Sequence, residues 1–270
     1  LKTVGVEDES MRLLEYRLLA AALPKTEFVD ASGVIASLRM FKDESETAAM
    51  QKAAEIAERA LAAAIAEIKI GMSELEVASL LLQQVLKAGS AGELPFQPIV
   101  STGPNGANPH ATPSERKMQK GDLLVIDFGA SFQGYFSDIT RTFAVGGYSE
   151  EQERVYNSVL AANQAGRAAA APGVTCGAVD DAARKAIEDA GYGQHFIHRT
   201  GHGLGMQSHE PPYIRAGNPM TLEPGMTFTI EPGIYLPDQF GVRIEDDVVV
   251  TADGLHSFTS FPRELQVIGG

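Results

Sequence analysis

Apolar and polar residues follow helical spacing in several long, alanine-rich stretches of this chain. In residues 11–22 the leucines gather on one side of a predicted helix, and Pro24 ends it. Ser73 and Glu76 have the spacing of a capping box at the start of another helix. The pattern predicts helices over residues 11–22, 35–39, 43–68, 73–88, 150–171 and 175–190.

Short runs rich in β-branched and aromatic residues predict strands after the second and third pairs of helices. Residues 28–29 are expected to form a short extended piece, and Pro-Gly and Asp turns separate the runs near the end of the chain. Strands are expected over residues 98–102, 123–128, 135–145, 226–230 and 242–251. Helices and strands grouped in this way predict an α+β fold.

Two segments of the chain echo one another. Residues 71–77 (G-M-S-E-L-E-V) resemble residues 173–179 (G-V-T-C-G-A-V), and each lies between a long and a shorter predicted helix. Strands follow each helix pair, which favours two αβ halves related by a pseudo-twofold axis. The alternative is that any two capped helices look alike.

Composition and charge narrow the class of protein. The chain has 270 residues, is 44% hydrophobic and carries a net charge of −13, so it can bury the core of one large domain. This negative charge argues against nucleic acid or an anionic membrane as a partner. Cys176 is the single cysteine, which excludes an intrachain disulfide and fits a cytoplasmic location. We identify no signal peptide and no apolar run of the roughly 20 residues that span a bilayer.

Five potential metal ligands lie in short segments that are separated along the sequence. Four carboxylates and one imidazole form an oxygen-rich set that suits two divalent ions of the manganese, cobalt or zinc kind. Such a pair of ions activates a bridging water at neutral pH. The predicted ligands are Asp127, Asp138, His202, Glu231 and Glu245.

Each of these residues also has a structural interpretation. An Asp at a strand end often caps a turn, but Gly129 and Gly134 allow the chain to fold back and bring Asp127 and Asp138 together on adjacent antiparallel strands. A carboxylate that closes an apolar strand, as Glu231 does, is costly to bury without a partner. Arg243 and Glu245 share a strand face and would otherwise form a surface ion pair.

Several histidines are candidates for proton transfer near these ligands. His110 precedes Asp127 and His198 precedes His202 in the sequence. His209 follows His202 after a short segment. A single histidine of this kind is more often a structural hydrogen-bonding group, but several that converge on one site are candidate catalysts. Other hydrolase signatures, H-E-x-x-H, C-x-x-C and G-x-S-x-G, are absent from the sequence.

The combined motifs resemble those of a known family. The runs D-F-G-A-S-F-Q-G-Y-F-S-D-I-T-R-T-F, H-R-T-G-H-G-L-G-M-Q-S-H-E-P-P, T-I-E-P-G-I-Y and V-R-I-E-D-D look like those of proline-specific dinuclear metallopeptidases. These are the Xaa-Pro dipeptidases (prolidases) and aminopeptidase P, which share the pita-bread fold. The resemblance covers residues from about 43 to the C-terminus and implies hydrolysis of the bond preceding proline in a small peptide.

The resemblance also implies roles for individual residues. Asp127 would bind one metal, Asp138 and Glu245 would bridge both, and His202 and Glu231 would complete the other. His209 would stabilise or protonate the tetrahedral species. His110 and His198 would contact the proline side of the substrate, and Arg243 would orient the carboxylates. Because all five ligand positions match, metal-free relatives such as creatinase are disfavoured.

The first 40 residues resemble the tail of a separate N-terminal domain, so residues 41–270 are expected to form the catalytic domain and the longer protein to be a homodimer. The compact spacing of Glu231 and Glu245 favours a dipeptidase, with Arg215 either a partner for a dipeptide carboxylate or a solvated loop residue. Aminopeptidase P is the alternative. A non-catalytic binding protein with the same fold is an alternative of another class, although such relatives tend to lose ligands.

Overall fold

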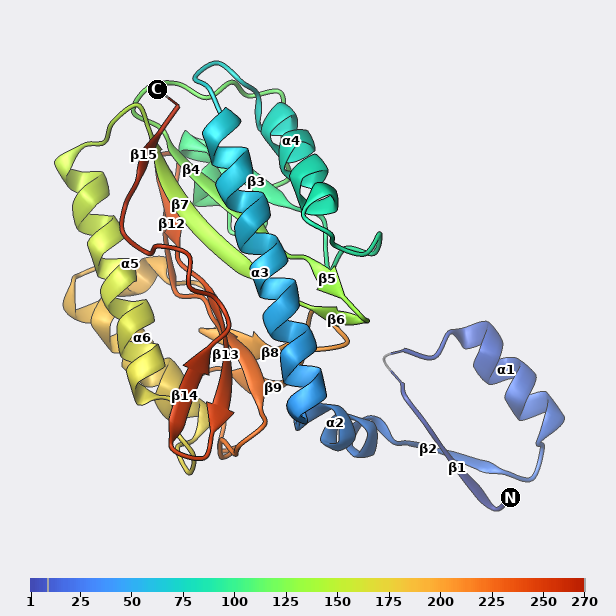
Figure 1. Ribbon diagram of the computed structural model, residues 1–270. Helices are drawn as coiled ribbons and strands as arrows, with labels where there is room; N and C mark the ends of the chain where they lie inside the picture. Colours follow the sequence, from blue (N-terminus) through green and yellow to red (C-terminus); the bar gives the residue numbers. More distant parts are fainter. Residues whose placement is uncertain (9, 270) are drawn as a thin grey trace.

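The computed structural model describes residues 1–8 and 10–269 as a mixture of helices and strands (Figure 1). All of the predicted helices form, with ends within a few residues of the expectation, and Ser73 and Glu76 form the predicted capping box. The helices are α1 (Leu13–Ala22), α2 (Ser32–Met40), α3 (Glu44–Glu67), α4 (Glu74–Lys87), α5 (Glu150–Ala169) and α6 (Cys176–Asp189), with short 3-10 helices η1 (Gly103–Ala107) and η2 (Gly193–His195).

The strands are more numerous and shorter than the sequence pattern predicts. They are β1 (Thr3–Val6), β2 (Glu27–Asp30), β3 (Ile99–Thr102), β4 (Leu123–Phe128), β5 (Ser131–Phe132), β6 (Tyr135–Phe136), β7 (Ile139–Val145), β8 (Gly201–Gly203), β9 (Glu210–Ile214), β10 (Thr227–Ile230), β11 (Gly233–Leu236), β12 (Phe240–Arg243), β13 (Asp246–Thr251), β14 (Gly254–Ser257) and β15 (Val267–Ile268).

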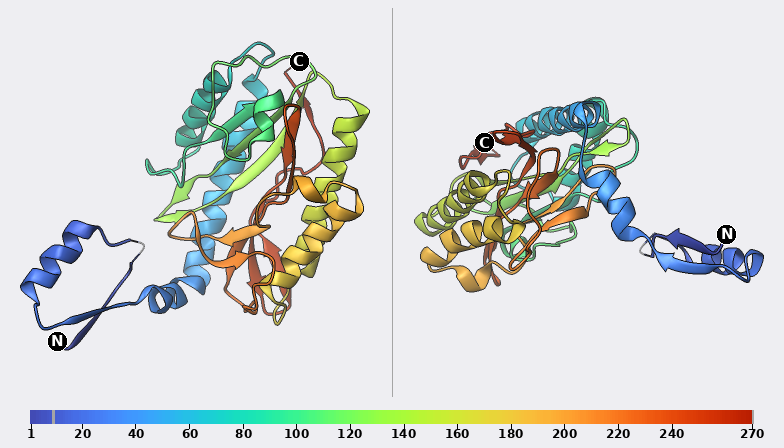
Figure 2. Two further views of the ribbon diagram at one scale, coloured as in Figure 1. Left: turned by 180° about the vertical axis from the view of Figure 1, so that it is seen from behind. Right: turned by 90° about the horizontal axis from the view of Figure 1, so that it is seen from below.

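Two sheets form the framework of residues 41–269. The first has the order β15-β7-β4-β3, and the second has the order β14-β13-β10-β8-β9; all neighbours in them are antiparallel except β15 and β7. Apolar side chains of α3 and α4 pack on the first sheet, and those of α6 pack on the second. Seen from below in Figure 2, the strands lie between the α3–α4 pair and the α5–α6 pair.

The backbone hydrogen bonds confirm the predicted internal repeat. Gly71 N donates to Met118 O at 3.0 Å, and Gly173 N donates in the same way to Leu222 O at 2.9 Å. Both glycines have positive φ, 92° and 85°, a conformation that glycine adopts without steric cost. Each half therefore begins with a helix pair whose connecting turn is bonded to the segment leading into its sheet.

Two strands predicted as continuous are each broken in two, and each break lies at a predicted ligand. The expected strand 135–145 divides into β6 and β7 around Asp138, whose N–H donates to the Asp247 carboxylate at 2.8 Å. The expected strand 242–251 divides into β12 and β13 around Glu245, because β12 pairs with β11 whereas β13 pairs with β10. Between them, Glu245 N donates to Thr140 O at 3.1 Å, which links the two sheets at the site.

Residues 1–8 and 10–30 stand away from this framework (Figures 1 and 2). β1 pairs in parallel with β2. Helix α1 has no buried residue and exposes its leucines, and its Tyr16 ring lies 5.6 Å from the Phe28 ring of β2. Helix α2 connects this segment to α3. Among the helices in the described part of the chain, none has the length and apolar character needed to cross a membrane.

Candidate metal centre

A single cavity of about 520 Å³ brings together the five predicted metal ligands, the three candidate histidines and Arg243. The cavity opens between the two sheets and receives residues from both halves of the repeat. Its lining includes Asp127, Asp138, His202, Glu231, Glu245, His110, His198, His209 and Arg243. Arg215 does not line this cavity and is exposed just after β9.

Asp127 and Asp138 approach one another because the chain turns back between β4 and β7. Asp127 pairs across the sheet with Thr140, and Asp138 directly precedes β7, so the two carboxylates lie on the same face. A Cβ atom at Gly129 would lie only 1.9 Å from Ser137 O, which means that glycine is required where the two segments cross. This is the antiparallel arrangement that the sequence predicted.

His202 lies in β8, the short strand between β9 and β10. Its Nδ1 is 3.1 Å from Gly203 O and donates to that carbonyl, which leaves Nε2 free to bind a cation. Nε2 lies 3.7 Å from Asp138 Oδ2 and 3.6 Å from Glu231 Oε1. At Gly201 a Cβ atom would lie 1.8 Å from Thr229 O, so the glycines around His202 permit close strand contact.

Glu231 and Glu245 complete the group from the second half of the chain. Glu231 N donates to Thr200 O at 2.7 Å, which fixes the residue at the end of β10. Glu245 Oε2 accepts a hydrogen bond from Thr140 Oγ1 at 2.6 Å. One ligand atom each of Asp138, His202 and Glu245 lies within 4.8 Å of the others, a separation that fits a shared cation.

The buried carboxylates of the predicted ligands lie in an environment that favours a bound cation. Burial and the neighbouring carboxylates Glu245 and Asp127 raise the pKa of Asp138 well above its usual value. Burial likewise raises the pKa of Glu231 to about 8. The Oδ1 atoms of Asp127 and Asp138 are buried with no hydrogen-bond partner among the described residues. Carboxylates that are crowded, buried and unpartnered fit hard divalent cations.

Arg243 connects the carboxylates to one wall of the cavity. Its Nη2 donates to Asp127 Oδ2 at 2.5 Å and its Nη1 donates to the Tyr235 hydroxyl at 2.8 Å. The Tyr235 hydroxyl in turn lies 2.8 Å from His198 Nε2. Burial and the Arg243 charge lower the pKa of His198 to about 3, so this histidine is neutral at physiological pH. The hydrogen bonds fix its ring orientation and tautomer.

The other two histidines face the cavity more openly. The His209 ring centroid lies 3.9 Å from that of His202, so the two imidazoles are neighbours over the carboxylates. Burial lowers the pKa of His209, and Arg199 adds to the effect. His110 is exposed and also lines the cavity, and its backbone N–H donates to the Asn108 side chain at 3.0 Å.

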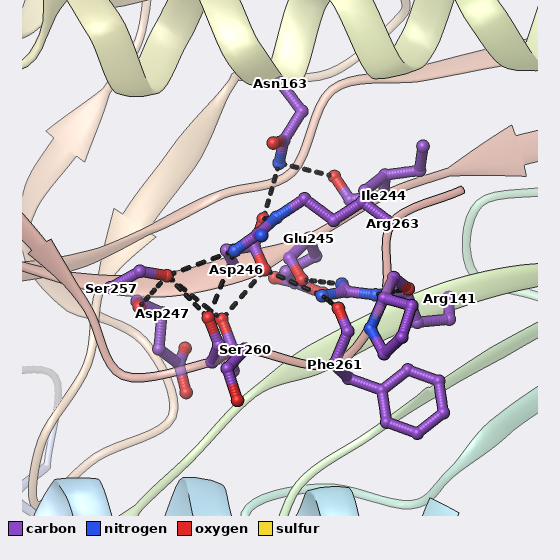
Figure 3. Close-up of polar contacts among 12 residues, drawn as sticks. Arg141, Asn163, Ile244, Glu245, Asp246, Asp247, Ser257, Ser260, Phe261 and Arg263 are labelled. Atoms are coloured by element: carbon purple, nitrogen blue, oxygen red, sulfur yellow. Dashed lines mark hydrogen bonds and ion pairs between the residues drawn. The ribbon is translucent and has the colours of Figure 1, made fainter.

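Arg141 and Arg263 form a cluster around Asp246, next to the predicted ligand Glu245 (Figure 3). At its centre Asp246 accepts hydrogen bonds from Arg141 Nη2 at 2.8 Å and Arg263 Nε at 2.7 Å. Burial by itself raises the pKa of Asp246, but the charge of Arg141 and the bonds from Arg263 outweigh it and hold this pKa well below its usual value. Arg141 also donates to the backbone oxygen of Glu245. The cluster therefore fixes the backbone at a predicted ligand.

The sequence interpretation did not assign roles to three residues that support the site: Thr140, Tyr235 and Asp246. Thr140 follows Asp138 at the two-residue spacing of one strand face, a signal that marks it as a neighbour of the carboxylates. Tyr235 and Asp246 stand within quoted motifs, but nothing in their spacing distinguishes them from ordinary strand residues.

Comparison with known proteins agrees with this geometry. The chain is 42% identical over 265 residues to the Xaa-Pro dipeptidase of Lactobacillus delbrueckii subsp. lactis, covering 98% of this chain and 72% of the relative. It superposes on a prolidase from Thermococcus sibiricus with a TM-score of 0.95 and 43% identity, covering 98% and 72% of the two chains. An X-Pro aminopeptidase from Thermotoga maritima gives 0.93 and 38%, covering 99% and 76%.

The fold and the cavity thus define a metallopeptidase of the pita-bread class, as the sequence predicted. The chain belongs to metallopeptidase family M24, whose model matches residues 48–252. Residues 1–41 match the Creatinase/Prolidase N-terminal domain. Family membership implies divalent metal ions, and the cluster of Asp138, His202 and Glu245 is consistent with them.

Proposed function

We propose that this protein is an Xaa-Pro dipeptidase that hydrolyses the peptide bond preceding proline with two divalent ions, Mn²⁺ in preference to Co²⁺ or Zn²⁺. The observation that carries the proposal is the convergence of the five predicted ligands in one cavity walled by three histidines. The relative from Lactobacillus delbrueckii and the prolidase from Thermococcus sibiricus support the choice of substrate.

Asp127, Asp138, His202, Glu231 and Glu245 would hold the ions, which supply Lewis acidity and an activated water when bound. His202 presents Nε2 because its Nδ1 is engaged by Gly203 O. Arg243 holds Asp127 in place and, through Tyr235, orients the neutral His198 ring towards the substrate. His209 lies beside His202, where it can donate a hydrogen bond or a proton to the developing tetrahedral species.

The remaining predictions concern the longer protein and its setting. We propose that residues 1–40 are the tail of an N-terminal domain and that residues 41–270 form the catalytic domain, which the match of residues 1–41 to the Creatinase/Prolidase N-terminal domain supports. A homodimer and a cytoplasmic location follow from the family resemblance and from the single cysteine. Sedimentation analysis of the protein tests whether it is a homodimer. A compartment-specific localisation experiment tests whether it is cytoplasmic.

Aminopeptidase P activity is the second candidate, because an X-Pro aminopeptidase is also structurally similar to this chain. The two functions differ in the length of the preferred substrate. Hydrolysis of an Xaa-Pro dipeptide and of an Xaa-Pro-Xaa tripeptide, each measured with added Mn²⁺ and with a chelator, separates them. Preference for the dipeptide supports the proposal, and preference for the tripeptide replaces it with the second candidate.

The Asp138→Ala variant tests the assignment of the metal ligands. We expect it to abolish hydrolysis, since Asp138 is assigned to both ions, whereas Asp189→Ala at an exposed position at the end of α6 should leave turnover intact. Near-normal turnover in Asp138→Ala would contradict the dinuclear site. Metal binding by the wild-type protein without cleavage of any Xaa-Pro bond would indicate a non-catalytic binding protein.

A further inference from the structure

A second buried ion pair lies outside the metal centre, and the proposed mechanism does not use it. Lys42 Nζ lies 2.5 Å from Glu210 Oε1, and the side chains are only 1% and 3% exposed. Lys42 follows α2 and precedes α3, whereas Glu210 begins β9. The pair therefore joins the end of the N-terminal segment to the second sheet.

Glu210 immediately follows His209, the histidine that lies beside His202. The loop of residues 204–209 connects β8 to β9, and the β8–β9 pairing is irregular where the loop begins. Glu210 Oε2 accepts the backbone N–H of Gln207 at 3.3 Å, so its carboxylate is bonded both to the loop and to Lys42. Among the described residues, the His209 side chain has one possible hydrogen bond, a long contact of 3.4 Å with the Ser208 hydroxyl, besides its ring contact with His202. The ion pair therefore anchors the residue that directly follows His209.

Lys42 is itself held firmly in place. Its backbone N–H donates to Gly225 O at 2.9 Å, in the turn before β10. Its side chain packs against the loop at Gly205, where a Cβ atom would lie 2.6 Å from Lys42 Cε and 3.0 Å from Glu210 Oε1. Gly205 O accepts a hydrogen bond from Phe136 N at 2.8 Å, which ties the same point of the loop to β6. The loop therefore lies directly on the ion pair.

We propose that Lys42 is a positioning residue that acts through Glu210 to hold the loop of residues 204–209, and with it His209, over the metal ligands. The inference rests on the proposed function in that His209 serves hydrolysis. A buried ion pair adds little to stability compared with apolar residues of the same size. Its directional hydrogen bonds instead define one geometry for the loop, and a catalytic group displaced by about 1 Å can lose about a hundredfold in rate.

The test uses two variants of the full chain with bound Mn²⁺. Lys42→Met leaves the Glu210 carboxylate buried without its charged partner and is expected to destabilise the fold as well as the loop. The double variant Lys42→Met/Glu210→Met replaces both charges with apolar side chains of similar length, so it should fold even if the single variant does not. The matched control is Lys185→Met/Asp189→Met, which removes an exposed ion pair of 2.8 Å on α6.

In the double variant we expect kcat for an Xaa-Pro dipeptide to fall about tenfold to a hundredfold. KM should change less than about twofold, because His209 is assigned to the transition state and not to substrate binding. The metal content should equal that of the wild type. Amide hydrogen exchange in residues 204–210 should accelerate by about tenfold or more, without a similar change in α3 or β10.

Wild-type kcat and wild-type exchange in the folded double variant would overturn the proposal. A loss of metal, or a rise of KM with kcat intact, would also overturn it, because the pair would then act on the metal ligands or on substrate binding. If the wild-type protein cleaves no Xaa-Pro dipeptide, the proposed function fails separately. The exchange rate of the loop and the metal content then decide whether Lys42 holds the loop.

Discussion

Thr140 donates a 2.6 Å hydrogen bond from its hydroxyl to the carboxylate of Glu245, although the two residues belong to different halves of the repeat. Thr140 O also accepts the backbone N–H of Glu245 at 3.1 Å. One residue of the first sheet thus orients both the backbone and the side chain of a predicted ligand in the second. Loss of such a contact to a metal ligand typically weakens metal binding about tenfold to a hundredfold.

The Thr140→Val variant removes only the hydroxyl. We expect the affinity for Mn²⁺ to fall about tenfold to a hundredfold, because Glu245 loses the bond that orients its carboxylate. Competition with a fluorescent chelator measures the affinity without reference to activity. Thr142→Val is the control, since Thr142 on the same strand bonds the backbone of Arg243 and no carboxylate. Equal affinities in the two variants would count against the role of Thr140.

Without bound metal, the free energy of unfolding should fall as pH rises. The pKa of Glu231 is raised to about 8, and those of Asp138 and Glu245 are raised as well. A carboxyl with a raised folded pKa binds its proton more tightly in the folded state, so its contribution is present at low pH and is lost as pH rises. His198 and His209, whose pKa values are lowered, act in the opposite sense below about pH 6.5, so the chelated protein should lose stability between about pH 6.5 and about pH 8. Denaturant unfolding with and without Mn²⁺ measures this.

The Mn²⁺-loaded protein should show little of that loss, because the cations favour the ionised carboxylates. The stabilisation by Mn²⁺ should consequently grow with pH across the same window. A chelated protein whose stability rises steadily towards pH 8 would show that these carboxyls are already ionised without metal.

The Asp246→Asn variant should be strongly destabilised. Loss of one charge leaves Arg141 buried beside a neutral partner, and breaking such a pair costs about 3–5 kcal/mol. The pKa of Asp246 is depressed in the folded state, so its contribution is present above the ordinary value of about 4 and is lost as pH falls below it. The difference from the wild type, measured by denaturant unfolding, should therefore shrink in acid. An Asp189→Asn control on the surface should show no measurable change.

The Tyr235→Phe variant tests the link between Arg243 and His198. The phenyl ring preserves the packing but removes the hydroxyl that contacts both residues at 2.8 Å. Hydrogen bonds to charged groups contribute about 1.5–3 kcal/mol, so kcat/KM should fall about tenfold to a hundredfold while the metal content stays constant. Tyr156→Phe, which loses a buried bond to Arg263 O away from the cavity, should keep its kcat/KM. An equal kcat/KM in the two variants would show that the Tyr235 hydroxyl does not couple Arg243 to His198.

The Gly129→Ala variant tests the crossing that brings Asp127 towards Asp138. A methyl group there would lie 1.9 Å from Ser137 O, so the segments must separate. We expect loss of Mn²⁺ binding or failure to fold. Gly134→Ala, at the hairpin tip with φ of 85° and open space, should cost only about 1–2 kcal/mol. A folded Gly129→Ala protein with normal Mn²⁺ affinity would contradict the predicted pairing of the aspartates.

Local chemistry made the helices predictable. The capping box at Ser73 and the glycine at 71 mark helix ends by interactions within a few residues, and those ends agree with the structure. The strands depend on distant partners, so their breaks at Asp138 and Glu245 follow from pairing that no local pattern contains. The three-residue strand around His202 is likewise too short to predict, because only β9 and β10 on either side define it.

The site residues could be predicted because each has a recognisable local sequence context, such as a carboxylate at the end of an apolar strand or a histidine between glycines. Their roles as ligands and catalysts stay predictions for the experiments above. Asp246 and Lys42 carried no such signal. Their partners, Arg141 and Glu210, are far away in the sequence, and only the folded chain shows that these charges are buried together.

The predicted ligands are divided between the halves of the repeat: Asp127 and Asp138 belong to the first, and His202, Glu231 and Glu245 belong to the second. An ion held by both groups would act on the polymer as a reversible cross-link that closes a loop containing all of α5 and α6. Closing so long a loop restricts the unfolded chain considerably. Neither half could then unfold on its own without releasing the ions, so the protein's resistance to proteolysis would depend on its metal supply.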